Sequence, residues 1–296
     1  MINNSSDILV SLKYVKRGRY SEVWHSLKGN PGAVLGLVLI FLLLLVIVYT
    51  FIFVSFEQVT AMNARNRFSP PCREFIFGTD DMGRDLFLRT LYGTRYSFVV
   101  GFGSIVFSLA IGVFLGALAG YFGGWADEVI TRASDVLASI PAILLGMCLV
   151  TVLGANLLNL TLAVGIPAIP LFLRLARASV IMQKGHEYVE SAMAVGLSSF
   201  RIVFSQILPN GLSPLIVATT TSIGTSILFA SGLSFLGFGI PVPTPEWGAI
   251  ISSGRTFIRS APHIAFFPGM FILLTSLAFI LLGDGLQDAL DPKLKT

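Results

Sequence analysis

The sequence predicts an all-α integral membrane protein with six transmembrane helices. Hydrophobic residues make up 54% of its 296 positions and charged residues only 12%, whereas a soluble protein of this size spreads many charges over its surface. Long uncharged windows support the prediction, because roughly 20 apolar residues cross the hydrocarbon core of a bilayer. The windows without Asp, Glu, Lys or Arg are 29–56, 96–126, 136–173, 202–245 and 260–283.

The first helix is expected at 31–56, after a basic cytoplasmic N-terminal segment, 1–30. We interpret this helix as a retained signal anchor, because its apolar run is too long for a secretory signal and no small-residue cleavage site follows. The next stretch, 57–94, is polar and contains Pro70 and Pro71. It is therefore expected to form an extracytoplasmic loop.

The other five helices are expected within 95–283, the second of them over about 95–120. The window 136–173 would be ~57 Å long as one helix at 1.5 Å per residue, which is nearly twice the membrane thickness. We therefore predict a break at Gly154-Ala155-Asn156. The expected later elements are helices at about 131–153, 157–177, 211–237 and 263–283, followed by a cytoplasmic tail at 284–296.

Six spans after a basic N-terminus place both termini and the loop 187–210 in the cytoplasm. Inside segments then hold more Lys and Arg than outside segments, as the positive-inside rule requires. A run of arginines between 65 and 95 makes this difference modest.

Composition argues against several classes of function. Cys72 and Cys148 are too few and too far apart for a disulfide framework, and three scattered histidines form no metal-binding pattern. The net charge of +4 comes from short flanks rather than from one basic face, which argues against nucleic-acid binding. The polar segments are too short for an independent enzyme domain, and no GxxxxGK[ST] phosphate loop occurs. We expect a chain that is not an enzyme and binds no cofactor or metal itself.

The segment 187–210 predicts a compact helical knob on a cytoplasmic loop. It combines two acidic residues one turn apart, small residues that permit close approach, a glycine that lets the chain turn and a proline that ends the second helix: Glu187, Glu190, Ser191, Ala192, Gly196 and Pro209. On spacing alone, docking on a partner protein and lying on the lipid surface are equally good interpretations.

This segment resembles the EAA loop of ABC importer permeases, which couples an ATPase to the membrane helices. The matching positions are Glu190, Ala192, Gly196, Ile207, Leu208 and Pro209. Ser191 stands where Ala is usual, and Gln206 stands where His is common. Both departures preserve the size or the hydrogen-bonding ability of the usual residue.

Three further motifs resemble the dipeptide/oligopeptide/nickel branch of these permeases. They are FGTDDMGRD at 77–85, PTPEWG at 243–248 and LGDGLQDALDP at 282–292. The chain is therefore identified as similar to the C-type permease subunit of that branch. The resemblance implies the type I ABC importer permease (MetI-like) fold and a translocation pathway for di- and oligopeptides, with nickel chelates or glutathione as alternative substrates.

The same resemblance implies the partners and the location of the chain. A homologous permease subunit would complete a heterodimer in the plasma or inner membrane, and an extracytoplasmic binding protein would deliver substrate. Two ATP-binding subunits would carry ATP and Mg, so hydrolysis would take place on these partners.

Three other features are candidates for function. The hydroxyl-rich fifth helix could line the pathway or could simply bond its own backbone carbonyls; its candidates are Thr220, Thr221, Thr225 and Ser226. Arg132 and Asp135 lie one turn apart and could pair or reach the interface, and we favour gate or structural support over a proton relay. Trp247 is a candidate interfacial anchor or outer-gate residue.

Gly112, Gly116 and Gly120 form a small-xxx-small stripe, for which we predict close helix packing. Two classes of function compete with the permease interpretation. A secondary transporter would need intramembrane ionisable groups and often shows inverted repeats, yet only Asp135 is a candidate. A membrane assembly scaffold would leave transport intact when the chain is deleted.

Overall fold

The computed structural model describes residues 19–290, and residues 291–296 of the expected tail and 1–18 of the expected N-terminal segment lie outside this range. The described chain is helical and contains no β-strand, only an isolated bridge between Thr79 and Asp85. Its α-helices are α2 (Arg19–Gly29), α3 (Pro31–Phe53), α4 (Phe56–Thr60), α5 (Leu86–Phe122), α6 (Gly124–Ser139), α7 (Ala142–Leu153), α8 (Leu157–Gly165), α9 (Ile169–Lys184), α10 (Glu187–Ala194), α11 (Ser199–Ile202), α12 (Leu208–Asn210), α13 (Ser213–Leu233), α14 (Trp247–Gly254) and α15 (His263–Leu290).

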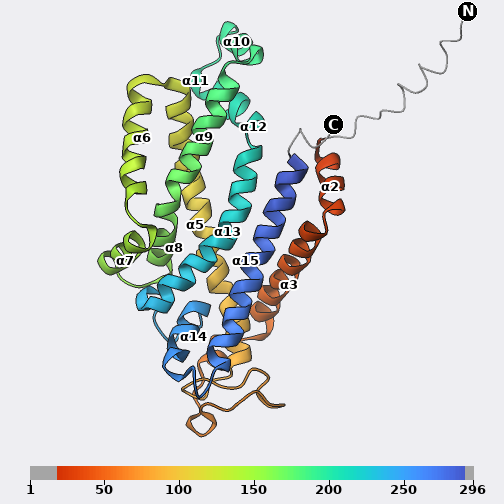
Figure 1. Cartoon of the computed structure of the whole chain (residues 1–296), viewed down its shortest axis with the longest axis vertical. Helices are drawn as coiled ribbons and strands as arrows, with labels where there is room; N and C mark the ends of the chain where they lie inside the picture. Colours follow the sequence, from red (N-terminus) through yellow and green to blue (C-terminus); the bar gives the residue numbers. More distant parts are fainter. Residues whose placement is uncertain (1–18, 291–296) are drawn as a thin grey trace, which may run out of the picture.

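Within the described residues, five helices or helix pairs are long and apolar enough to cross a membrane without a sharp bend. They are Pro31–Phe53, Leu86–Phe122, Leu157–Lys184, Ser213–Phe238 and His263–Leu290. They run lengthwise through the molecule, with α10 at one end and α14 at the other (Figure 1). The start of α2 and the end of α15 lie toward the α10 end (Figure 1).

The expected continuous third helix, 131–153, is wrong. Two helices occupy this region, α6 and α7, and they are bent by 90° at a short break. Pro141 lies in that break, where its ring and missing N–H interrupt a helix. The described residues form up to six spans if this bent pair counts as one. The predicted break at Gly154-Ala155-Asn156 is confirmed, because α7 ends at Leu153 and the Asn156 side chain caps the start of α8.

Two expected boundaries are also wrong. The second long helix begins at Leu86 rather than near 95, because Asp85 caps it by accepting hydrogen bonds from the N–H groups of Phe87 and Leu88. The expected extracytoplasmic loop 57–94 therefore ends inside α5. At the other end of the chain, the helix α15 continues to Leu290, so that the first part of the expected tail is helical.

Glycines allow α5 to pack closely against α9, as the small-residue stripe predicts. A Cβ added at Gly116 would lie 2.3 Å from the carbonyl oxygen of Leu173, and one at Gly120 would lie 2.8 Å from that of Arg177. Such contacts leave no room for a side chain and bring the two backbones together. The Arg177 side chain also pairs with Asp127 at 2.5 Å, which joins α6 to α9.

The FGTDDMGRD motif forms a buried ionic cluster at the α14 end of the bundle. Asp80 accepts a 2.6 Å bond from Nε of Arg84 and lies 3.3 Å from Nε of Arg89, and all three side chains are at most 2% exposed. Arg89 also donates to the carbonyl oxygen of Val59 at 2.9 Å. The motif therefore holds the polar loop onto the start of α5. Asp81, 3.6 Å from Arg84, supplies the second carboxylate that balances the two arginines.

Candidate functional site

The segment α10–α12 is a knob that projects from the end of the bundle formed by α5 and α9 (Figure 1). Its inner side joins a buried apolar cluster with these two helices. Val189 and Ile207 are fully buried in that cluster, together with Val180 of α9 and Ala117 of α5. Packing of this kind makes the knob rigid with respect to two membrane-spanning helices.

Gly196 ends α10 in the way its sequence position predicts. Its φ of 81° is in the left-handed region that favours glycine. The N–H of Gly196 bonds to the carbonyl oxygen of Met193 at 2.9 Å, and that of Leu197 bonds to Ala192 at 3.2 Å. This pair of bonds is a Schellman motif, and it turns the chain toward α11.

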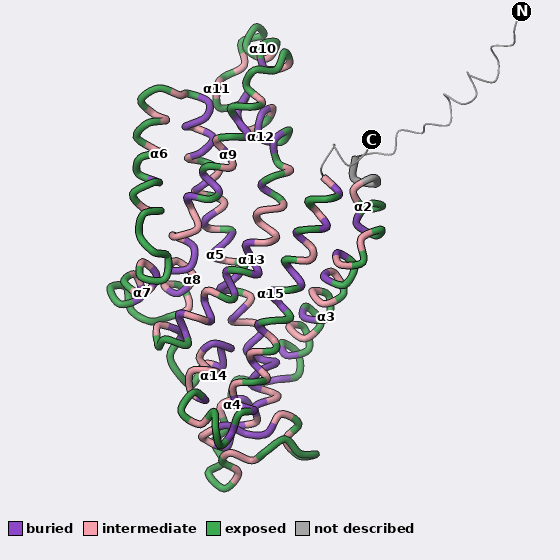
Figure 2. Tube along the Cα trace, viewed as in Figure 1, coloured by how far each residue is buried: buried purple, intermediate pink, exposed green. Residues whose placement is uncertain are grey.

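The outer side of the knob is exposed and mixes acidic, small and apolar residues. Glu187 and Glu190 are exposed in the first turn of α10, where the helix dipole stabilises negative charge. Val195 is 82% exposed and Phe200 is 62% exposed. Apolar side chains this exposed beside a charged pair are typical of a protein-binding surface. Sequence reasoning missed Val195 and Phe200, because hydropathy does not show that the chain around them is largely exposed (Figure 2).

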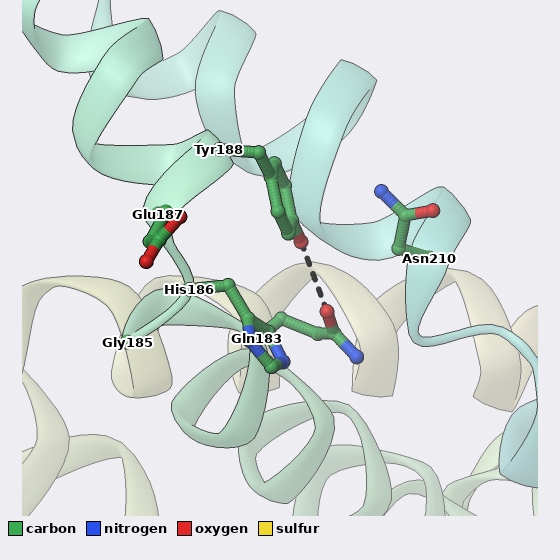
Figure 3. A pocket seen from close by; sticks show the side chains of 6 residues that line it. All are labelled: Gln183, Gly185, His186, Glu187, Tyr188 and Asn210. Atoms are coloured by element: carbon green, nitrogen blue, oxygen red, sulfur yellow. Dashed lines mark hydrogen bonds between the residues drawn. The ribbon is translucent and has the colours of Figure 1, made fainter.

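A polar pocket of about 780 Å³ lies at the base of α10, between the end of α9 and α12. Tyr188 donates a 2.9 Å hydrogen bond from its hydroxyl to Oε1 of Gln183 across this pocket, and Asn210 faces it from α12 (Figure 3). The ring of His186 stacks on Tyr188 with centroids 5.9 Å apart. The pocket adds hydrogen-bonding groups next to the Glu187 carboxylate, so the knob offers both protrusions and a recess.

The structure separates the expected coupling residues into two groups. Glu187, Glu190, Ser191, Gly196 and Pro209 are exposed, whereas Ile207 and Leu208 are buried and Ala192 and Gln206 are partly buried. The exposed group can contact a partner, and the buried group anchors the knob. The chain passes through one π-helical turn, Val203–Ile207, on its way to Pro209.

The hydroxyl groups of α13 mostly bond their own helix. Oγ1 of Thr220 donates to the Ile216 carbonyl at 2.9 Å, and Thr225 donates to Ser222 at 3.1 Å. Thr221 also bonds within α13 and packs against Gly283 of α15. Ser226 is buried, and Thr225 is exposed. Intrahelical bonding thus occurs at three of the four candidates, and a place in the pathway stays a prediction for all four.

Arg132 and Asp135 do not form the expected pair. Arg132 bonds instead to Glu128 of the same helix at 2.9 Å, and both residues are exposed on α6. Asp135 is exposed as well. Their role in gating or support stays a prediction.

Trp247 is fully buried, so its interpretation as an interfacial anchor is wrong. The residue before it, Glu246, caps α14 by accepting 2.9 Å bonds from the N–H groups of Gly248 and Ala249. Burial raises the pKa of the Glu246 carboxyl, and its hydrogen bonds oppose that shift. Sequence reasoning identified this motif by resemblance, and the structure shows it holding α14 against α5.

The bundle of long apolar helices and the rigid exposed knob define a multi-pass membrane permease that has a contact surface at one end. Residues 112–296 match the family of binding-protein-dependent transport system inner membrane components, and residues 18–71 match the N-terminal TM domain of oligopeptide transport permease C. The chain belongs to this family of ABC importer permeases, which confirms the resemblance in its sequence.

Curated relatives include a dipeptide transport system permease protein DppC from Alkalihalophilus pseudofirmus, which is 42% identical over 96% of this chain and 93% of its own length. A glutathione transport system permease protein GsiD from Pectobacterium atrosepticum is 48% identical over 74% of this chain and 73% of its own length.

Among solved structures, the chain resembles an inward-facing MetNI methionine ABC transporter. The TM-score is 0.55 at 18% identity, over 67% of this chain and 94% of that one. This likeness concerns the fold alone, and it confirms the predicted MetI-like class.

Proposed function

We propose that the chain forms half of the translocation pathway of an ATP-driven importer for short peptides, and that its α10–α12 knob docks on an ATP-binding partner subunit. The relatives named for dipeptide and glutathione transport support this substrate class, since glutathione is itself a small peptide. Nickel chelates are the alternative cargo.

The observation that carries the docking proposal is the anchoring of the knob. Its apolar side is buried against α5 and α9, while Glu190, Val195 and Phe200 face outward. A partner that pushes on this outer side moves two membrane-spanning helices, because the buried side cannot slide without opening the core. The movement of an ATPase pair would reach the membrane in this way.

The arrangement of the ends supports a cytoplasmic location for both termini. The helix α2 begins, and the helix α15 ends, toward the knob end of the bundle (Figure 1). An ATPase partner that docks on the knob would lie in the cytoplasm, at the same end. We propose that ATP and Mg bind to that partner, and that a homologous permease and an extracytoplasmic binding protein complete the importer.

A charge reversal on the knob tests the proposal. The complete importer with Glu190→Lys is reconstituted in proteoliposomes and compared with Glu74→Lys, which changes an exposed acid in the loop at the opposite end. We expect Glu190→Lys to abolish the stimulation of ATPase activity by the binding protein and the uptake of labelled dipeptide, and Glu74→Lys to preserve both. Unchanged coupling in Glu190→Lys, with normal membrane insertion, would overturn the docking role.

A further inference from the structure

Two apolar grooves flank the ends of α13 and α15 nearest the knob. One, of about 290 Å³, lies on the α2 side, and its walls include Trp24, Leu212, Ile216 and Leu286. The other, of about 540 Å³, lies on the α9 side. Ser213 and Leu290 line both grooves, so the two meet between the ends of these helices. We call them together the α13–α15 gap.

The gap opens because α13 and α15 are held together only farther along their length. A Cβ added at Gly283 would lie 2.2 Å from Cγ2 of Thr221, and Ser276 donates a 2.8 Å bond to the carbonyl oxygen of Gly224. Beyond this contact, toward Leu212 and Leu290, the grooves separate the two helices.

The chemistry of the lining selects the occupant. No charged side chain lines either groove in the part of the chain that the structure describes, and the walls are mainly aliphatic. Water against an apolar surface of this kind finds few hydrogen-bond partners, so covering the surface with hydrocarbon is favourable. Hydrocarbon fits such a surface, and the gap lies at the ends of two candidate membrane spans, Ser213–Phe238 and His263–Leu290.

The α2 wall adds a polar recognition element at the mouth. The ammonium group of Lys28 lies 5.1 Å from the ring centroid of Trp24, and Trp24 lines the gap while remaining 52% exposed. Tryptophan favours the membrane–water interface, and a lysine there attracts anionic headgroups.

We propose that the α13–α15 gap binds a phospholipid, with an acyl chain between the two helices and an anionic headgroup beside Lys28. The lipid would lie against Pro209 and Leu212, where the knob joins α13. The gap contains none of the outward-facing docking residues Glu190, Val195 and Phe200, so the lipid site can fail while the proposed function holds.

The test uses the importer purified with its partner subunits and incubated with vesicles of equal phosphatidylglycerol and phosphatidylcholine. Native mass spectrometry then counts the lipids retained by each complex. Ile216→Trp fills the gap, and Leu273→Trp is the matched control, since Leu273 is 55% exposed on α15 outside the gap. We expect retained lipid to fall in Ile216→Trp and to stay at the wild-type amount in Leu273→Trp.

The headgroup is tested separately with Lys28→Gln. We expect the wild-type complex to retain about fivefold more phosphatidylglycerol than phosphatidylcholine, and the Lys28→Gln complex to lose most of that preference. Equal retention by Ile216→Trp and Leu273→Trp would overturn the proposal. If the tryptophan variant does not assemble, a photo-crosslinking amino acid at position 216 replaces it as the test. Crosslinks to lipid support the site, and crosslinks to a partner chain overturn it.

Discussion

Trp247 donates a hydrogen bond from its indole Nε1 to the carbonyl oxygen of Thr90, at 2.8 Å, inside the protein. The ring fits there because Gly93 has no side chain: a Cβ at that position would lie 2.3 Å from the carbonyl oxygen of Pro245 and 3.0 Å from Cδ1 of Trp247. The contact joins the proline-rich segment to α5, and it explains why an aromatic residue follows Glu246.

Removing this hydrogen bond should destabilise the protein without changing its fold. Trp247→Phe keeps much of the apolar contact but removes the indole hydrogen bond to the buried Thr90 carbonyl, which costs about 1 kcal/mol. We expect a lower Tm in detergent by scanning fluorimetry. Trp125→Phe is the control, because Trp125 is 79% exposed; equal Tm values for the two variants would contradict the role of the bond.

Asp80 should be the most sensitive position in the FGTDDMGRD motif. Its loss leaves Arg84 and Arg89 buried without their shared carboxylate, and an uncompensated buried charge costs about 3–5 kcal/mol. We expect Asp80→Ala to lower both the amount of protein in the membrane and its Tm. Glu74→Ala in the same loop removes an exposed acid and should change neither; a similar loss in both variants would contradict the cluster.

Close packing between α5 and α9 should not tolerate a large side chain. Gly116→Leu forces the backbones apart, at a cost of about 3 kcal/mol, and we expect protease sensitivity and loss of transport. Gly269→Leu is the matched change, because a Cβ at Gly269 meets no atom within 4 Å. Normal folding of Gly116→Leu would show that the helices can separate without penalty.

The turn at Gly196 can be tested without adding a steric clash. A Cβ at Gly196 meets nothing within 4 Å, and only its φ of 81° opposes a side chain. Gly196→Ala should therefore cost about 1 kcal/mol and weaken coupling of ATPase activity to uptake. Gly185→Ala adds a methyl group in equally open space at φ −82°, and coupling should remain normal there. The prediction is wrong if both variants couple equally well.

Much of the fold could be predicted from local chemistry. Uncharged windows locate the long helices because a bilayer excludes unpaired charge, and Gly154-Ala155-Asn156 marks a break that the window length already requires. Sequence reasoning missed the bend at Pro141, because the window from 136 to 173 carries no charge and hydropathy does not show the direction in which a helix runs. It also predicted a start of α5 that is too late in the sequence. The reason is that the charged residues Arg89 and Arg95 favoured a loop, although Asp85 is a good helix cap.

The candidate site, like the fold, could be predicted only in part from the sequence. Acidic, small, glycine and proline residues in 187–210 determined a helical knob with a turn at Gly196, and the resemblance identified its family. Only the tertiary structure decided which knob residues anchor and which face outward, that Asp80 is buried between two arginines, and that Trp247 is internal. Those outcomes depend on which distant segments meet: helix periodicity and hydropathy describe each segment alone, whereas burial and pairing arise from contacts between segments.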